Sequence, residues 1–259
     1  MAVVICVANQ KGGVSKTTTA TAIADILMQS DHKVLLVDTD PQCNATDTYR
    51  ATTDAVATLY DVLIYHDPTI EAIQHTEVGD ILPCDPFLMQ ADVQLTSAPD
   101  KEHLLRMALE PVLDMYDYII IDTPPSMGIL LVNALVCSHG VVIPTTADRY
   151  TLQGLSQLGQ TINKVRATLN PQLQILGLLR MKFNMRMKIN IAANKAFSSV
   201  AADLGTTVFR TYIRDCVSAR DAQVMKTQLS SYAPRSTVYK DYKEFVSELQ
   251  EVIKEKVAV

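Results

Sequence analysis

Short apolar runs, rich in β-branched residues and bounded by polar or turn-forming positions, recur along the chain. Because nearly every position in such a run is apolar, the pattern predicts strands buried on both faces, as in a parallel sheet. We expect strands at AVVICVA from Ala2, KVLLVD from Lys33, YDYIIID from Tyr116, GVVIP from Gly140, LQILGLLRM from Leu173 and TTVFRTYI from Thr206.

Stretches with apolar residues at helical spacing separate these runs, over 17–29, 127–137, 152–169, 189–204 and 239–256. Strands that alternate with helices predict an α/β fold: a doubly wound, mostly parallel sheet with helices on both faces. Residues 45–112 are less regular, and we expect short helices there around a strand near GDILPCD. The chain contains no repeat or Pro/Gly-rich linker, so residues 1–259 are expected to form a single domain.

Composition excludes several classes of protein. No apolar run approaches the ~20 residues that a membrane-spanning helix needs, and the opening MAVVICVA lacks the basic segment of a secretory signal. The five cysteines include no C-x-x-C pair, which fits a reduced cytoplasm and argues against a zinc or iron–sulfur site.

The net charge of −5 is unevenly distributed. Residues 1–179 carry 9 Lys/Arg against 20 Asp/Glu, a net of −11, whereas residues 180–226 carry nine basic residues against three acidic ones, a net of +6. A basic segment in an acidic protein is a candidate surface for a polyanion, although scattered solvated charges would give the same count.

The stretch ANQKGGVSKTTT, from Ala8, lies between the first predicted strand and the first predicted helix. Strand, glycine-containing turn and helix in this order are typical of a phosphate-binding loop, in which backbone N–H groups surround the phosphates. Ser15 stands where the usual pattern has its second glycine, which is costly if φ there is positive. The predicted nucleotide-binding residues are Lys11, Gly12, Gly13, Val14, Ser15, Lys16, Thr17 and Thr18, with Lys16 on the phosphates and Thr17 on Mg²⁺.

Three aspartates follow the ends of predicted strands. Asp38 and Asp40 lie two residues apart in VLLVDTDPQ, and Asp122 ends YDYIIID. Residues two apart on an extended chain face the same side, and ligands of parallel sheets bind beyond the carboxyl ends of the strands. We therefore expect all three carboxylates to face the phosphates, as ligands of the Mg²⁺ environment or to orient the attacking water.

These motifs together resemble the ParA/MinD family of ATPases. The loop is similar to the family's deviant Walker A motif, K-G-G-x-x-K-[ST], and VLLVDTDPQCNAT resembles its second motif with Cys43 in place of a glycine. DYIIIDTPPSMGILLVNAL and VVIPTTADRYTLQGLSQL resemble the Walker B region and the segment after it. The resemblance is closest to ParA (Soj-like) partition ATPases, without the N-terminal DNA-binding domain of the longer subtype.

The resemblance implies a P-loop NTPase fold that uses ATP and Mg²⁺. It implies that Lys11 reaches across a homodimer to the partner's phosphates, so that ATP drives formation of a nucleotide sandwich dimer. By position, Lys11, Lys16 and Asp40 match the catalytic residues, with Asp40 orienting water, and Thr17, Asp38 and Asp122 match the metal environment. It also implies a cytoplasmic, nucleoid-associated protein that binds DNA non-specifically and is stimulated by a ParB-like centromere-binding partner.

The C-terminal third departs from the family pattern. Where relatives often have I-P-R-N-V-R-L-S-E-A-P, this chain has YIRDCVSARDAQ, so that Asp215 and Ser218 occupy the positions of the two arginines. The regional charge supplies substitutes, because non-specific DNA binding depends on charge more than on a fixed motif. The candidate DNA-binding residues are Arg186, Lys188, Lys195, Arg214 and Arg220.

Two alternative functions remain open. A MinD-like membrane ATPase needs a basic amphipathic C-terminal helix, but the tail YKDYKEFVSELQEVIKEKVAV carries four lysines against five acids and is expected to pack on the domain without contacting a membrane. A scaffold with a degraded ATP site is suggested only by Ser15 and Cys43.

Overall fold

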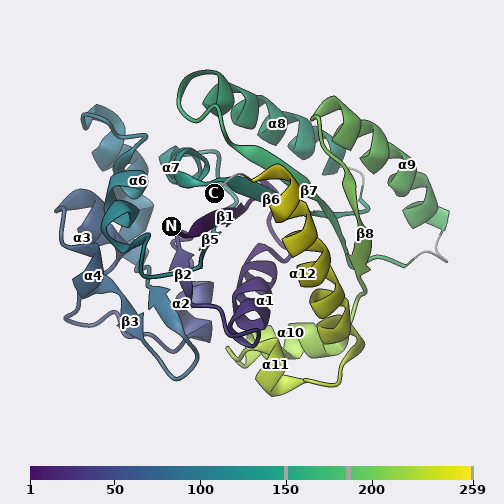
Figure 1. The fold of residues 1–259 in the computed structure, drawn as a ribbon, viewed down its shortest axis with the longest axis horizontal. Coiled ribbons are helices and arrows are strands. Elements are labelled where there is room, and N and C mark those ends of the chain that lie inside the picture. The colour runs from purple at the N-terminus through teal and green to yellow at the C-terminus, as the bar shows by residue number, and fades with distance from the viewer. Residues whose placement is uncertain (149–150, 185–187, 258–259) are drawn as a thin grey trace.

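A computed structural model describes residues 1–148, 151–184 and 188–257 (Figure 1). Their centre is an eight-stranded sheet of order β3-β4-β2-β5-β1-β6-β7-β8. Every pairing is parallel except that of β3 with β4, which confirms the predicted mostly parallel sheet. The strands are β1 (Val3–Val7), β2 (Val34–Asp38), β3 (Gln74–His75), β4 (Asp80–Leu82), β5 (Tyr118–Asp122), β6 (Gly140–Thr146), β7 (Gln174–Met181) and β8 (Val208–Ile213).

Helices cover both faces of this sheet, each over its own hydrophobic core. On one face, α1 (Lys16–Met28) packs with α12 (Thr237–Lys256), next to α10 (Val217–Val224) and α11 (Leu229–Tyr232). On the other face, α6 (Leu104–Leu109), α7 (Ile129–Cys137), α8 (Thr151–Thr168) and α9 (Lys188–Asp203) follow one another from β4 towards β8. The predicted helix boundaries agree with these to within about two residues.

Residues 45–112 form the short helices that were predicted around a strand. Two-residue β3 and three-residue β4 extend the sheet edge beside β2, and each helix that the structure describes in this region has six residues or fewer. They are α2 (Asn44–Thr48), α3 (Leu59–Ile64), α4 (Thr69–Ala72), α5 (Ala91–Gln94) and α6, with the 3₁₀ turns η1 (Pro86–Gln90), η2 (Leu95–Ser97) and η3 (Glu110–Val112).

The strand register brings three chain segments together at one edge of the sheet. Asp122 at the end of β5 pairs with Asp38 of β2 on one side and with Val7 of β1 on the other. The loop 8–15 and the two acids therefore leave the sheet side by side, at the carboxyl ends of parallel strands where ligands bind.

The C-terminal helix α12 packs on the domain, as predicted. Its apolar side chains, which include Phe245 and Leu249, are buried in the core shared with α1 and β8. Phe245 meets Phe209 of β8 edge to face, with ring centroids 5.0 Å apart. Among the helices that the structure describes, none combines the length and the apolar character needed to cross a bilayer.

Candidate nucleotide site

The loop between β1 and α1 has the backbone shape of a phosphate cradle. Gly13 and Ser15 both adopt the left-handed conformation, with φ of 74° and 66°. A Cβ added to Gly12 or Gly13 would meet no atom within 4 Å, so the concave side of the loop is open. Ser15 is the residue before the first turn of α1, which directs the helix N-terminus at the same space.

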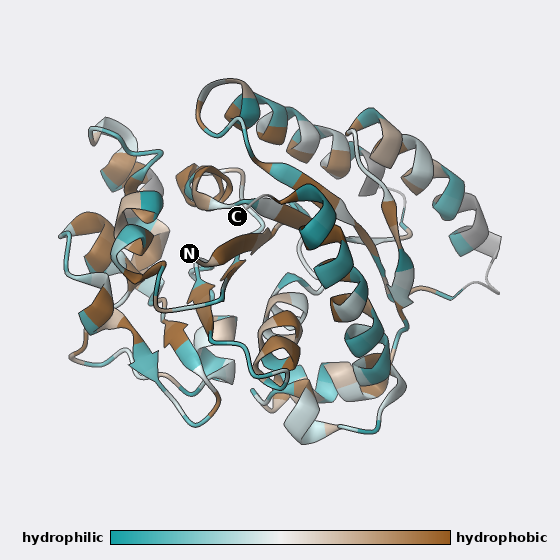
Figure 2. Cartoon of the chain, viewed as in Figure 1, coloured by the Kyte–Doolittle hydropathy of each residue, from teal (hydrophilic) through white to brown (hydrophobic). Residues whose placement is uncertain are grey.

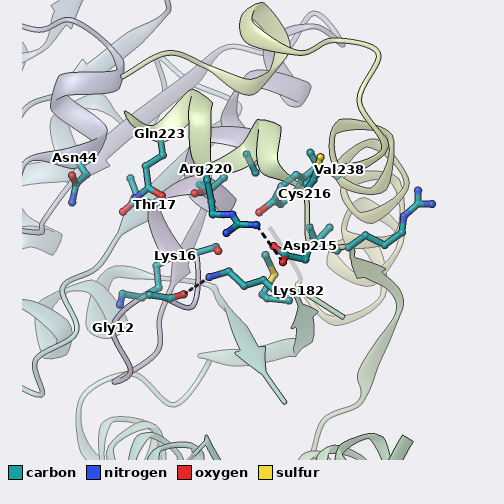
Figure 3. Close-up of a pocket in the computed structure, with 18 of the residues that line it drawn as sticks. Gly12, Lys16, Thr17, Asn44, Lys182, Asp215, Cys216, Arg220, Gln223 and Val238 are labelled. Carbon is teal, nitrogen blue, oxygen red and sulfur yellow. Dashed lines mark hydrogen bonds and ion pairs between the residues drawn. The ribbon is translucent and has the colours of Figure 1, made fainter. Parts of the chain in front are cut away.

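A cleft of about 390 Å³ opens in front of this loop (Figure 3). Its walls come from the loop, from the segment after β2, from the ends of β7 and β8, and from α10 and α12. The side chains named in the close-up view are Gly12, Lys16, Thr17, Asn44, Lys182, Asp215, Cys216, Arg220, Gln223 and Val238. The volume and the mixed lining are typical of a pocket for a small organic anion.

Lys16 is a buried cation at the base of the cleft. Its side chain is 7% exposed, and its Nζ donates to the carbonyl of Lys11 at 3.3 Å. Burial lowers the pKa of Lys16, while the nearby Asp122 and Asp40 carboxylates oppose that effect. One backbone carbonyl leaves most of the donor capacity of an ammonium group unused, so the site is suited to an anionic ligand.

Asp122 is fully buried, and neither of its carboxylate oxygens has a hydrogen-bond partner among the described residues. Burial raises the pKa of Asp122 well above its usual value, and the Asp38 carboxylate adds to this, although the neighbouring Thr17 hydroxyl counteracts it. A buried carboxylate without a partner is costly unless a cation, water or ligand completes its environment. Asp122 and the Thr17 hydroxyl therefore offer hard oxygen atoms suited to Mg²⁺.

Asp38 differs from Asp122, because its oxygens are satisfied inside the chain. One oxygen accepts from the Asp40 backbone N–H at 3.1 Å, and the other accepts from the backbone N–H and the hydroxyl of Thr46, both at 2.8 Å. Burial raises the pKa of Asp38 to about 6 against the effect of these hydrogen bonds. Strand β2 ends at Asp38, so the alternation of side chains along a strand does not determine the position of Asp40. Asp40 lies instead in the turn after the strand, where its Oδ1 accepts from the Gln42 backbone N–H at 3.1 Å.

Cys43, like Ser15, stands where the family pattern has glycine and has a positive φ. It precedes α2 with φ of 54°, in the left-handed region. Both substitutions therefore keep the backbone that glycine would adopt, at a cost of about 1 kcal/mol each. The loops retain their shape, and the departures from the motif do not by themselves indicate a collapsed site.

Lys11 precedes Gly12, the first loop residue of the cleft lining, and is held by a residue far away in sequence. Its Nζ forms an ion pair with Asp148, which also accepts from the Thr146 hydroxyl at 2.6 Å. The side chains of Lys11 and Asp148 are both about one-third exposed. In this single chain the early lysine of the loop is thus directed towards the end of β6.

The sequence did not identify the residues that close the other side of the cleft. Lys182, just after β7, donates from Nζ to the Gly13 carbonyl at 3.2 Å, and Arg220 pairs with Asp215 at 3.5 Å (Figure 3). Cys216 and Gln223 belong to the same wall. The only signal for them was the resemblance of YIRDCVSARDAQ to a segment of the family, which did not assign any of its residues to this cleft.

Most cations of the basic segment have partners inside the protein. Arg214 forms a two-pronged contact with Asp241 of α12, at 2.9 and 2.5 Å. Three further cations have acids or carbonyls as partners: Arg210 pairs with Glu248 and Glu251, Lys226 pairs with Asp47, and the buried Arg180 donates to the carbonyls of Phe209 and Arg210.

The DNA-binding candidates consequently divide into groups. Arg214 and Arg220 line the nucleotide cleft and carry intramolecular ion pairs. Lys195 is exposed on α9, and it takes part in none of the ion pairs among the described residues. Arg186 lies outside the described residues, and Lys188 begins α9 with a side chain outside them.

The described residues contain no group of three or more His, Cys, Asp or Glu side chains placed to hold a metal ion together. A cation at Asp122 and Thr17 would therefore need further oxygen ligands from a bound phosphate or from water. This is the usual arrangement for Mg²⁺, which keeps several waters and binds through one or two protein oxygens together with substrate phosphates.

Comparison with known proteins agrees with this geometry. A family model described as an AAA domain matches residues 2–175. The sporulation initiation inhibitor protein Soj of Bacillus subtilis is 36% identical over 252 residues, covering 96% of this chain and 98% of Soj. The chromosome partitioning protein ParA of Myxococcus xanthus is 43% identical over 189 residues, covering 72% of this chain and 67% of ParA.

A solved structure shares the architecture over the whole chain. The Mycobacterium smegmatis cobyrinic acid a,c-diamide synthase, with an ATP analogue and magnesium bound, has a TM-score of 0.79 and 28% identity, covering 100% of this chain and 99% of the synthase. With the sheet order, the loop and the acids after β2 and β5, these matches show that the chain belongs to the ParA/MinD family of P-loop ATPases.

Proposed function

We infer that the protein is a Mg²⁺-dependent ATPase of the partition type, whose nucleotide controls a sandwich dimer. The observation that carries this proposal is the convergence of an open phosphate cradle, a buried Lys16 and an Asp122 whose oxygens lack partners. Each of these features is costly without a ligand, and ATP with Mg²⁺ supplies the matching charges.

Different groups of the chain are assigned to the phosphates, to the metal ion and to the attacking water. Backbone N–H groups of residues 12–18 surround the phosphates, and the Lys16 ammonium contacts the β and γ phosphates. Thr17 and Asp122 hold the Mg²⁺, which neutralises phosphate charge when bound. Asp40, fixed by the turn that follows β2, orients a water molecule for attack.

In this assignment Asp38 contributes indirectly. Its carboxylate accepts the Asp40 backbone N–H and both donors of Thr46, so it fixes the loop that carries Asp40. A direct place for Asp38 in the metal environment, which the family resemblance implies, would require at least one of these hydrogen bonds to open.

Dimer formation is proposed to depend on Lys11. The single chain holds Lys11 against Asp148, and a partner's phosphates would offer a stronger negative charge than this one carboxylate. Lys11 would exchange Asp148 for those phosphates when two protomers close over ATP, and a cation supplied in trans would neutralise charge on the transferred group.

DNA binding is the part of the proposal that rests most on relatives. It is supported by the similarity to Soj and ParA, by exposed Lys195 and by the positions of Arg186 and Lys188 in the sequence beside it. Arg214 and Arg220 contribute less, because their charges are compensated internally. Two protomers would double the cations on one face, so the ATP-bound dimer is the DNA-binding form, and a ParB-like partner would release it by stimulating hydrolysis.

The alternatives fit less well. The apolar face of α12 is buried in the domain core and so is not offered to a membrane, as a MinD-like role would require. A degraded scaffold would not need Lys16, Thr17, Asp40 and Asp122 at one cleft.

The deciding experiment follows dimer formation and DNA retention together. With Mg²⁺–ATP, light scattering should detect a dimer for the wild type and a longer-lived dimer for Asp40→Ala, but a monomer for Lys11→Ala. Cosedimentation with plasmid DNA at ~50 mM salt, where such contacts are strong, should follow the dimer, and anionic liposomes should retain neither. Retention by liposomes alone would sink the partition role, and a stable Lys11→Ala dimer would contradict the trans lysine.

A further inference from the structure

Residues 58–110 form a strongly acidic lobe at the β3–β4 edge of the sheet (Figure 1), and none of its described residues lines the nucleotide cleft. Hydrophobic and hydrophilic segments lie side by side on this lobe (Figure 2). Residues 58–110 carry ten Asp/Glu against two Lys/Arg, a net of −8. Several of the acids are exposed: Asp67, Glu71, Glu77, Asp100 and Glu110. Among the described side chains of the lobe, Asp80 is the one carboxylate in an ion pair, with His75. The lobe therefore presents negative charge that the fold does not compensate.

Large apolar side chains are exposed on the same lobe. Tyr65 is 64% exposed, Phe87 61% and Met107 56%, and Ile70, Met89 and Val93 are exposed by more than half as well. Isolated exposed apolar residues are ordinary on a protein surface, but several on one acidic lobe indicate a contact surface.

Contacts through Tyr60 make this surface continuous. The Tyr60 ring lies 5.8 Å from that of Tyr65 and 6.0 Å from that of Phe87, measured between centroids, and its hydroxyl donates to Gln94 at 3.0 Å. Gln94 in turn lines a cleft of about 260 Å³. The lining of this cleft also includes the apolar Leu63, Leu95, Leu104 and Met107 and the acid Asp100. Rings and cleft together are called the Tyr60 surface below.

We propose that the Tyr60 surface binds a basic amphipathic helix supplied by a partner protein. The cleft and the flanking rings receive apolar anchors at helical spacing, and the acids beside them, Asp67 and Asp100, attract the cationic face. The negative charge of the lobe favours this partner over a second copy of the chain and over a membrane. A second copy of the lobe would bring its own −8 against the first, and an anionic membrane would be repelled. The inference does not depend on the proposed partition function, since the surface lies outside the nucleotide cleft.

The binding experiment uses the full-length protein and two synthetic peptides of lysine and leucine with the same composition. One peptide has leucine at helical spacing and the other alternates lysine with leucine, as on a strand. The helical peptide should bind more tightly in fluorescence anisotropy, and its affinity should fall as salt rises. Phe87→Ser and Met107→Ser should each weaken binding by about tenfold, and neutralising Asp67 and Asp100 with asparagine should weaken it by a few-fold and reduce the salt dependence.

Matched variants elsewhere test whether the effect is local. Val224→Ser changes an apolar residue of α10 that is 80% exposed, and Asp203→Asn with Glu255→Gln removes two exposed acids outside the lobe. These variants should bind the peptide as the wild type does, and unchanged thermal midpoints of all variants would exclude unfolding as a cause. Equal affinity for the two peptides, or equal weakening by the controls, would overturn the proposal. A nucleotide-independent dimer abolished by Phe87→Ser would also overturn it, by assigning the surface to a second copy.

Discussion

The phosphate-binding loop, residues 8–18, and the basic segment, residues 180–226, were both singled out in the sequence, and the structure treats them differently. Most residues from Gly12 to Thr18 line one cleft, because their placement depends on neighbours in the chain and on the end of β1. In the basic segment, by contrast, Arg210, Arg214 and Lys226 are turned to acids of α2 and α12. The geometry of a local motif is set mainly by residues close to it in sequence. A regional excess of charge does not show which acids will lie beside those charges in the folded chain.

Removing the Lys16 ammonium group should have the largest effect, which is on ATP affinity. Lys16 is buried beneath the cradle with one carbonyl partner, so Lys16→Ala should reduce ATP affinity by about 100-fold or more, as expected for loss of a desolvated charge contact. Isothermal titration calorimetry measures this directly. Lys195→Ala is the matched control, since Lys195 is an exposed lysine that does not line the cleft; an equal loss there would remove the distinction.

Removing a cation of the basic segment should instead affect stability. Arg214→Ala removes the guanidinium partner of Asp241, which is 7% exposed, but keeps the backbone N–H of residue 214. Because about half of the Arg214 side chain is in solvent, the free energy of unfolding should fall by about 1–2 kcal/mol. Lys195→Ala removes an exposed charge and should change it by less than about 0.5 kcal/mol. Denaturant titration compares the two, and equal midpoints would mean that Arg214 is a surface charge after all.

The acids at the cleft should make the nucleotide-free protein sensitive to pH. Burial raises the pKa of Asp38 to about 6 and that of Asp122 well above its usual value. The protonated forms are favoured in the folded protein, so this contribution to stability is complete below about pH 4 and is lost as pH rises through 6. Asp122→Asn removes the buried charge and keeps an oxygen that can accept from the neighbouring Thr17 hydroxyl.

That variant should therefore be more stable than the wild type at pH 7.5, with a difference that shrinks towards pH 4. Thermal midpoints across this range measure it. Parallel curves for the two proteins would show that Asp122 is already satisfied, and with it the argument for a cation site would fail. The acid that the basic segment meets on α12 behaves in the opposite way, because the Thr211 and Arg210 backbone N–H groups lower the pKa of Glu248 against the effect of burial.

DNA retention should respond to Lys195 more than to Arg220. Lys195→Glu should weaken retention of the ATP-bound form by a few-fold, as expected for the loss of about one phosphate contact per protomer. Arg220→Glu should weaken it less, since the Arg220 charge is compensated by Asp215, although nucleotide affinity must be measured in parallel. A larger loss for Arg220→Glu at saturating ATP would return the basic segment to its predicted role as one surface.

Much of the fold followed from the sequence, because parallel strands and their crossover helices have strong apolar patterns. The site was partly predictable for the same reason: Lys16, Thr17 and Asp122 lie at strand or helix ends that the pattern locates. The contacts of Asp38 and Lys11 could not be predicted from the sequence. Their partners, Thr46 and Asp148, are tertiary contacts that no spacing reveals, and the Arg214–Asp241 pair spans β8 and α12 in the same way.

The smallest expected effect lies within the loop and tests its backbone alone. Ser15 holds a left-handed φ of 66°, as Cys43 does at 54°, and glycine adopts this conformation without the steric cost of a Cβ. Ser15→Gly and Cys43→Gly should therefore each raise the free energy of unfolding by up to about 1 kcal/mol, less what is lost because glycine has more freedom in the unfolded chain. Ala22→Gly, within α1, should lower it by about 1 kcal/mol. A lower thermal midpoint for Ser15→Gly would show that the serine side chain stabilises the loop, and that the local motif, too, depends on contacts the backbone does not reveal.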